Sequence, residues 1–262
     1  MRALPMLLLL LVAGCRTGLN YPEPNEPRYE GVAAMDAVPP FPDTIRIVSF
    51  NIEFAKEVRR SIDILRGRPE LRGADVVLLQ EMTAPAARML AESLGVHHVY
   101  YPAIYNRLAR QDFGNAVLSR WPIVEDAKLI LPARSRYAGT QRIAVAATIR
   151  AGLRTLRVYS THLGTPADLA WQGRVEQLSA ILEDARDFPL VVIGGDMNSG
   201  EIGRVARAAG YDWPTDTIPA GTTFGRLDHV FLKGLTPFAA GTTPIPPGVS
   251  DHRPVWVHAV AR

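Results

Sequence analysis

The sequence predicts an α/β domain with mixed β-sheets, and three observations support this. Short apolar and β-branched runs alternate with stretches of helical periodicity along most of the 262-residue chain. The predicted strands outnumber the helices, and helices separate only some of them, which favours mixed sheets over a doubly wound parallel sheet. An apolar fraction of 47% with 21% charged residues is typical of a globular chain with ample core.

The expected elements can be assigned in chain order. The first strand covers residues 44–50 and delivers Asn51 at its end, and a helix follows over 57–65. A buried strand over 74–79 delivers Glu81, and a helix over 84–94 is closed by Gly95. Later elements are strands at 96–101, 116–119, 124–131, 143–149 and 153–161, a long helix within 166–187, and a buried strand at 190–193 that leads into Asp196.

The first residues of the chain predict a signal peptide over 1–14. Met1-Arg2 is followed by a short apolar stretch that is too short for a bilayer span, which needs about 20 apolar residues. The stretch closes with Leu11-Val12-Ala13-Gly14-Cys15, which resembles the lipobox of bacterial lipoproteins, so Cys15 is the expected lipidation site. An ordinary secretory signal with an incidental cysteine is the alternative. Cys15 is the only cysteine, which excludes a disulfide within the chain.

Residues 15–43 are proline-rich and predict a tether. Proline-rich segments are extended and semi-rigid, so this segment is expected to connect a lipid anchor to one domain over residues 44–262. The predicted protein is therefore a monomer held by its lipid at a bacterial envelope membrane, on the periplasmic or the outer face. The formal net charge of +3 is too small to indicate a nucleic-acid-binding protein, and no basic stripe is evident.

Six short segments between residues 49 and 252 carry oxygen or nitrogen ligands. They are Ser49-Phe50-Asn51-Ile52-Glu53, Leu79-Gln80-Glu81, Ser160-Thr161-His162-Leu163, Gly195-Asp196-Met197-Asn198, Leu227-Asp228-His229 and Ser250-Asp251-His252. Their order and chemistry resemble the DNase I-like endonuclease/exonuclease/phosphatase superfamily, over residues 44 to 260. The resemblance implies a four-layer α/β sandwich of two packed mixed sheets flanked by helices. It also implies that the chain hydrolyses a phosphodiester with Mg2+, for which Mn2+ is a substitute.

The resemblance places metal ligands at Asn51, Glu81 and Asp251. Phosphodiester hydrolysis needs charge neutralisation on the phosphoryl oxygens, an activated water and help for the leaving oxygen. A hard divalent cation bound by a few carboxylate or amide oxygens supplies the first of these. These three residue types fit that ligand chemistry.

The same resemblance assigns catalytic roles to two carboxylates, an amide and two histidines. Asp196 orients or deprotonates the attacking water, and Asn198 binds the phosphate or a metal-bound water. His252 is expected to pair with Asp228, which would fix its tautomer and raise its pKa. Either Asp196 or His252 is the general base. His162 is a second active-site histidine, as a phosphate binder or general acid.

Asn115 and Arg142 are the expected phosphate-binding residues, since an amide and a guanidinium both donate to phosphoryl oxygens. The remaining histidines are expected to have structural or surface roles. His229 should point away from the site if its segment is a strand. The stretch 213–226 is expected to shape substrate access.

Several functions remain open from the sequence. The substrate is a nucleic acid, a phospholipid such as sphingomyelin, or a small sugar or inositol phosphoester. A catalytically silent binding protein on the same fold is the alternative of another class, and it would lack a ligand or a histidine. None of the expected positions is missing. A scaffold that presents its proline-rich segment to a partner is the third reading.

Overall fold

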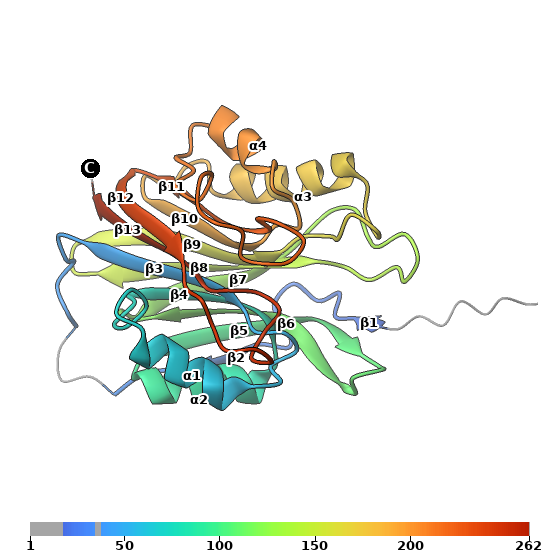
Figure 1. Cartoon of the computed structure of the whole chain (residues 1–262), viewed down its shortest axis with the longest axis horizontal. Helices are drawn as coiled ribbons and strands as arrows, with labels where there is room; N and C mark the ends of the chain where they lie inside the picture. The colour runs from blue at the N-terminus through green and yellow to red at the C-terminus, as the bar shows by residue number, and fades with distance from the viewer. Residues whose placement is uncertain (1–17, 35–37, 262) are drawn as a thin grey trace, which may run out of the picture.

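The computed structural model describes residues 18–34 and 38–261, and it has four layers (Figure 1). Helices α1 and α2 cover the outer face of an eight-stranded sheet, and α3 and α4 cover the outer face of a five-stranded sheet packed against it. The expected four-layer α/β sandwich is therefore confirmed. The predicted signal peptide and Cys15 lie outside the described residues. Within those residues, no helix is long and apolar enough to cross a membrane.

The larger sheet has the strand order β1-β5-β6-β4-β3-β13-β12, and β2 also pairs with β5. Only β3 and β4 are parallel neighbours, so the sheet is mixed, as predicted. Its strands are β1 (Gly18–Asn20), β2 (Tyr29–Gly31), β3 (Ile45–Asn51), β4 (Val76–Met82), β5 (His97–Asn106), β6 (Gln111–Ser119), β12 (Leu235–Thr242) and β13 (Val255–Ala261).

The smaller sheet has the order β11-β10-β9-β8-β7, with β9 and β10 parallel and the other pairs antiparallel. Its strands are β7 (Ile123–Ile130), β8 (Ile143–Ala151), β9 (Arg154–His162), β10 (Val191–Asp196) and β11 (Asp228–Lys233). The helices of the described residues are α1 (Val58–Gly67), α2 (Ala84–Leu94), α3 (Trp171–Asp184) and α4 (Gly203–Ala208).

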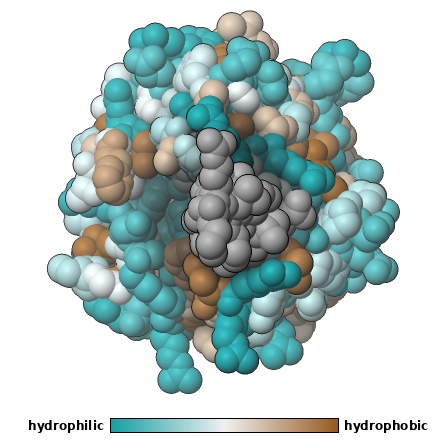
Figure 2. Space-filling view, turned by 90° about the vertical axis from the view of Figure 1, so that its right-hand side faces the viewer, coloured by the Kyte–Doolittle hydropathy of each residue, from teal (hydrophilic) through white to brown (hydrophobic). Residues whose placement is uncertain are grey.

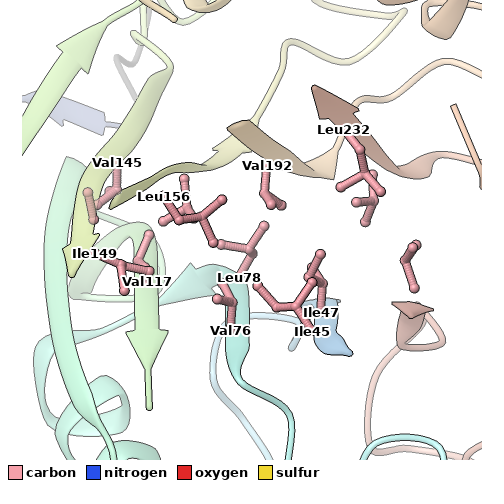
Figure 3. Close-up of a cluster of buried hydrophobic side chains, with 14 of the residues drawn as sticks. Ile45, Ile47, Val76, Leu78, Val117, Val145, Ile149, Leu156, Val192 and Leu232 are labelled. Atoms are coloured by element: carbon pink, nitrogen blue, oxygen red, sulfur yellow. The ribbon is translucent and has the colours of Figure 1, made fainter. Parts of the chain in front are cut away.

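A continuous apolar core fills the space between the two sheets. Side chains from both sheets meet there, among them Ile47 of β3, Leu78 of β4, Val145 of β8 and Val192 of β10 (Figure 3). Burial of this many apolar side chains is the main stabilising contribution, at about 25 cal/mol per Å² removed from water. The core makes the two sheets one rigid support for the loops at their ends.

Helix α2 shows how closely the local sequence determines an element. The Thr83 side chain accepts a hydrogen bond from the Ala86 N–H at 3.4 Å, and Pro85 lies in the first turn, where its missing N–H costs nothing. Gly95 ends the helix in the left-handed conformation at φ 69°. The predicted bounds of this helix are therefore confirmed.

The segment predicted to be a tether instead packs on the domain. Strands β1 and β2 pair with β5, and the Trp121 Nε1–H donates to the carbonyl of Pro39 at 3.0 Å. The physical reason is that β5 would otherwise leave an unpaired sheet edge, and an edge accepts short strands between prolines. Residues 18–31 thus contribute two strands to the larger sheet, although they precede residue 44, where the domain was predicted to begin.

The same segment also bonds to the smaller sheet. The Arg28 guanidinium donates to both carboxylate oxygens of Asp126 on β7, each at 2.7 Å. The buried Lys128 ammonium, also on β7, donates to the carbonyls of Tyr21 and Glu26. Residues 18–34 therefore join the edges of the two sheets.

Candidate active site

Three of the predicted catalytic residues stand in one row of the smaller sheet. Strand β10 lies between β9 and β11, and its last residue, Asp196, is directly opposite both His162 and Asp228. All three side chains are buried. Segments that are far apart in sequence therefore converge because β9 and β10 end, and β11 begins, in the same row.

The double glycine before Asp196 is required by this packing. A Cβ on Gly195 would lie 1.8 Å from the carbonyl oxygen of Thr161, and one on Gly194 would lie 2.6 Å from Leu78 of the opposite sheet. Neither position has room for a side chain. The two glycines thus allow β10 to approach β9 and the opposite sheet closely, and so bring Asp196 into the site.

The larger sheet supplies the two predicted ligands Asn51 and Glu81. Asn51 ends β3, and Glu81 sits at an irregularity of β4 between Leu79 and Met82, with φ 58°. A bulge of this kind re-aims a side chain at the end of a strand. The Glu81 carboxylate accepts hydrogen bonds from Asn51 Nδ2 at 3.1 Å and from the Phe54 N–H at 3.0 Å.

Asn51 links the two sheets at the site. Its Nδ2 group also donates to Asp196 Oδ2 at 3.2 Å, and its Oδ1 accepts the N–H of Glu53 at 3.0 Å. The same Asp196 oxygen lies 3.3 Å from His162 Nε2 and 3.6 Å from His252 Nε2. One carboxylate oxygen is therefore shared by an amide and two imidazoles.

The predicted pair of His252 and Asp228 forms. His252 Nδ1 lies 2.7 Å from Asp228 Oδ2, and both side chains are buried. Burial alone would lower the pKa of His252, but the hydrogen bond and charge of Asp228, with the charges of Asp196 and Asp251, raise that pKa to about 10. His252 is thus an imidazolium at neutral pH, and its Nε2 faces Asp196 Oδ2 at 3.6 Å.

Asp196 and His162 have shifted pKa values of opposite direction. Burial, followed by repulsion from Asp228, raises the pKa of Asp196 to about 7 against the opposing effects of His252 and its hydrogen bonds. Burial lowers the pKa of His162 well below its usual value, and the charges of Arg142 and His252 lower it further. His162 is therefore a neutral imidazole, and its buried Nδ1 has no hydrogen-bond partner within the described residues.

Asp251 is the exposed member of the set. Its backbone N–H donates to Glu53 Oε2 at 2.8 Å, which holds the loop after β12 against the end of β3. The Asp251 charge raises the pKa of Glu81 in addition to the larger effect of burial. Glu53, to which the sequence analysis gave no role, thus positions Asp251; its neighbour Lys56 forms an ion pair with it.

Asn198 lies in the turn after β10. Its backbone φ is 49°, a left-handed conformation that asparagine adopts more readily than most residues. Its N–H donates to Asp196 Oδ1 at 2.9 Å, and its side chain donates to the carbonyl of Leu163 at 3.0 Å. The turn therefore fixes the Asp196 carboxylate as well as Asn198.

Arg142 is half-buried, and no carboxylate among the described residues is in hydrogen-bonding contact with it. Its Nη1 has no partner within the described residues, and its guanidinium lies 5.9 Å from the ring centroid of Phe113. Burial lowers the pKa of Arg142, while the charges of Asp196 and Glu81 oppose that shift. A buried donor of this kind is suited to an anionic ligand.

Asn115 and Phe113 stand beside Arg142. Asn115 lies inside β6, and its side chain donates at 3.0 Å to the carbonyl of Ile143, the residue after Arg142. The Phe113 ring lies 5.8 Å from the His162 ring. Phe113 is a site residue that the sequence analysis missed, because an apolar residue in a predicted strand carries no signal of function.

His229 points away from these groups, as its place in β11 predicted. It is buried, lies 3.1 Å from Trp213 Nε1 and 2.9 Å from the carbonyl of Ser199, and so supports the loops around the site. The loop at 213–226 reaches the site, because a Cβ on Gly221 would lie 3.6 Å from Asp228 Oδ2.

Two groups of ligands in this site fit a cation. The first is the predicted set of Asn51, Glu81 and Asp251, which offers oxygen donors only. The second consists of Asp196, Asp228 and His252, whose ligand atoms lie within 4.8 Å of one another. In the second group, His252 Nδ1 and Asp228 Oδ2 already share a proton in a short hydrogen bond. Mg2+ also prefers oxygen ligands to the nitrogen of an imidazole. The first set is therefore the better magnesium site.

Comparison with known proteins agrees with this geometry. Residues 48–252 match the Endonuclease/Exonuclease/phosphatase family, and the chain belongs to that family. Its members are hydrolytic phosphoesterases. No curated protein matches the chain.

Solved structures share the fold. A protein described as endonuclease/exonuclease/phosphatase from Beutenbergia cavernae is 21% identical with TM-score 0.67, over 84% of this chain and 72% of that one. D. rerio TDP2 complexed with single strand DNA product is 17% identical with TM-score 0.67, over 83% and 99%. The human Nocturnin catalytic domain with bound sulfate anion is 17% identical with TM-score 0.65, over 85% and 96%.

Proposed function

We propose that this chain is a Mg2+-dependent phosphodiesterase of nuclease-like type. The observation that carries the proposal is the convergence of Asn51, His162 and His252 on one oxygen of Asp196, beside Glu81. Asn51, Glu81 and Asp251 are the proposed metal ligands, and Mn2+ is the proposed substitute. When bound there, the cation would neutralise charge on the phosphoryl oxygens.

Asp196 is the proposed general base. A pKa of about 7 leaves much of this carboxylate ionised at neutral pH and still basic enough to accept a proton from water. His252 is the weaker candidate, because its pKa of about 10 keeps it protonated. The imidazolium instead donates from Nε2 to a phosphoryl oxygen, and Asp228 holds it in orientation.

Arg142, Asn115 and Asn198 complete the proposed phosphate site, together with the neutral His162. The unpartnered Arg142 Nη1 supports this assignment, since a phosphoryl oxygen would satisfy it. Asn115 would act mainly by fixing the backbone next to Arg142.

The nuclease-like assignment takes support from the DNA product in the TDP2 structure. Phospholipase C- or sphingomyelinase-type action and hydrolysis of a small phosphoester are the alternatives. The catalytically silent binding protein is less favoured, because every predicted residue of the site is present and most of them are in contact.

We also propose that the chain is a monomeric lipoprotein of the bacterial envelope, attached to its membrane through Cys15. The support is the sequence Leu11-Val12-Ala13-Gly14-Cys15 after a short apolar stretch. Replacement of Cys15 by serine should release the protein from membranes.

The test is Mg2+-dependent nicking of supercoiled plasmid by the chain from Cys15 onward, with hydrolysis of bis(p-nitrophenyl) phosphate measured in parallel. Asp251→Ala should abolish both activities. The matched control is Asp187→Ala, an exposed carboxylate beyond α3, which should leave both unchanged. Cleavage of the small ester without nicking would keep the phosphodiesterase and reject the nuclease; no metal-dependent turnover of either would reject the proposal.

A further inference from the structure

The first described residue of the chain emerges at the end of the sandwich that carries the active site. Gly18 pairs with Asn106 at the end of the β5–β6 hairpin. On the other side of strand β1, Asn20 donates from Nδ2 to the carbonyl of Gly139 at 3.0 Å, and its Oδ1 accepts the Gln141 N–H at 2.9 Å. Strand β1 therefore lies between two loops, 106–111 and 133–140 (Figure 1).

The hairpin is bonded directly to the site. Gln111 Nε2 donates to the Phe54 carbonyl at 3.0 Å, and the Phe54 N–H donates to Glu81. Phe113, two residues further, packs against His162. The hairpin loop beside β1 thus lies next to the active site, and Figure 2 looks onto this end of the molecule.

These two loops combine basic and apolar side chains at their exposed tips. Leu108 is 80% exposed and Tyr137 is 74% exposed, and Leu19 on β1 between them is 49% exposed. Four exposed arginines accompany them, and neither loop contains an aspartate or glutamate. The arginines are Arg107, Arg110, Arg134 and Arg136. Within the described residues none of the four forms a salt bridge.

Exposed apolar side chains beside arginines that form no salt bridge among the described residues fit the surface of a bilayer with anionic lipids. The apolar groups enter the interface, and the guanidinium groups meet the lipid phosphates. Cys15 lies three residues before Gly18, and three residues span at most about 11 Å. An acylated Cys15 would therefore hold this end of the domain close to the membrane.

We propose that the loops 106–111 and 133–140 form a membrane-docking surface for anionic phospholipid, which seats the mouth of the active site against the bilayer. This proposal builds on the lipid anchor proposed above and does not depend on turnover. It makes phosphoesters at the bilayer surface the substrates with the readiest access to the site. Single-stranded nucleic acid is the other polyanion that arginines and an exposed tyrosine would attract.

The test is amide hydrogen exchange of the full chain on vesicles of phosphatidylcholine, with and without phosphatidylglycerol. Both loops should be protected on the anionic vesicles. The turn between β8 and β9 provides the internal control, because Leu153 there is fully exposed and Arg154 begins the strand whose other end, His162, is in the site. That turn should exchange equally in both samples.

A charge-reversed variant makes the test specific. Arg107→Glu with Arg134→Glu should lose the protection, whereas Arg186→Glu with Arg204→Glu, two exposed arginines near α3 and α4, should keep it. Leu108→Asp should lose protection and hydrolyse bis(p-nitrophenyl) phosphate at the unchanged rate. That activity also shows that the variant is folded.

The outcomes separate the docking surface from the anchor. A chain that floats with vesicles but shows no loop protection keeps the anchor and overturns the docking surface. If the chain carries no acyl group but still gains loop protection on anionic vesicles, the lipid anchor is overturned and the docking surface is supported. If a single-stranded oligonucleotide protects the loops and vesicles do not, the proposal of membrane docking is overturned and the surface is assigned to nucleic acid.

Discussion

Asp228 is proposed to act on catalysis through His252, and this dependence can be measured. It raises the pKa of His252 to about 10, and its repulsion also contributes to the raised pKa of Asp196. The proposed mechanism needs Asp196 ionised and His252 protonated. The plot of wild-type kcat/KM against pH should therefore be bell-shaped, with limbs near pH 7 and pH 10.

Asp228→Asn should therefore move both limbs to lower pH. Without the carboxylate, the pKa of His252 falls, so the protonated form is lost at a lower pH; the pKa of Asp196 falls because one repulsive charge is gone. We expect kcat/KM at pH 8 to fall by about 10²- to 10⁴-fold. Rates measured from pH 5 to 11 check this, and an alkaline limb that stays near pH 10 would contradict the role of Asp228.

Arg142 is the proposed phosphate-binding cation, and this role should come at the expense of stability. Its side chain is half-buried, and its buried Nη1 has no hydrogen-bond partner within the described residues. Arg142→Met should lower kcat/KM by about 10²- to 10³-fold, as for loss of a phosphate donor. The same change should leave the free energy of unfolding unchanged or raise it by about 1 kcal/mol, because a half-buried cation with an unpaired Nη1 is removed.

Two control variants test whether the charge of Arg142 alone, or the position of its guanidinium, accounts for the effect. Arg142→Lys should recover only part of the activity, because an ammonium lacks the planar fork. Arg154→Met, which removes a guanidinium stacked on Phe41 at the other end of β9, should leave activity unchanged. Urea unfolding and steady-state kinetics measure both effects. A large loss of stability in Arg142→Met would mean that the residue is structural.

At the scale of elements, the segment 18–34 is a strap across the edges of both sheets, and Arg28 is its main polar contact with β7. Burial alone would raise the pKa of Asp126, but hydrogen bonds from Arg28 and Tyr101 outweigh it and lower that pKa. Arg28→Ala should cost about 2 kcal/mol, less than a fully buried pair because Arg28 is one-third exposed.

The pH dependence of this contribution has a definite sign. Because the folded pKa of Asp126 is depressed, the stabilisation is present above the unfolded value near 4 and is lost as pH falls below it. Urea unfolding of wild type and Arg28→Ala should thus differ at pH 7 and converge towards pH 3. A difference independent of pH would attribute the loss to packing instead.

The strap also shows where prediction from sequence ends. Elements with local signals were predictable: α2 has its cap residues and Gly95, and β10 has its apolar run before the double glycine. Strands β1 and β2 have three residues each and lie among prolines, so they form only because β5 offers an edge. That edge is a property of the tertiary structure.

The site divides in the same way. Asp196, Asp228 and His252 were predicted because family motifs contain them, and the structure brings them together. The bulge that turns Glu81 into the site and the contact of Phe113 with His162 depend on register between strands, which one sequence does not contain. Their discovery required the fold.

At the scale of the whole molecule, burial and like charges at the site disfavour the ionised forms of two carboxylates, and a bound cation would favour them. Burial raises the pKa of both Glu81 and Asp196. A carboxylate with a raised folded pKa stabilises the fold at low pH and loses that contribution as pH rises through the folded pKa. Without metal, these two carboxylates should therefore make the domain less stable at pH 8 than at pH 5.5.

Mg2+ should reverse this loss. Saturation at 100 times the Kd adds about 2.7 kcal/mol, or roughly 5 to 10 °C in Tm for a domain of this size. The shift should be larger at pH 8 than at pH 5.5, because protonated carboxylates do not bind the cation. Glu81→Gln should raise Tm without metal, by removing one buried charge, and should reduce the shift that Mg2+ causes. Calorimetry of both proteins tests this, and an equal Mg2+ shift in Glu81→Gln would show that the cation binds elsewhere, with the Asp196, Asp228 and His252 group as the next site to vary.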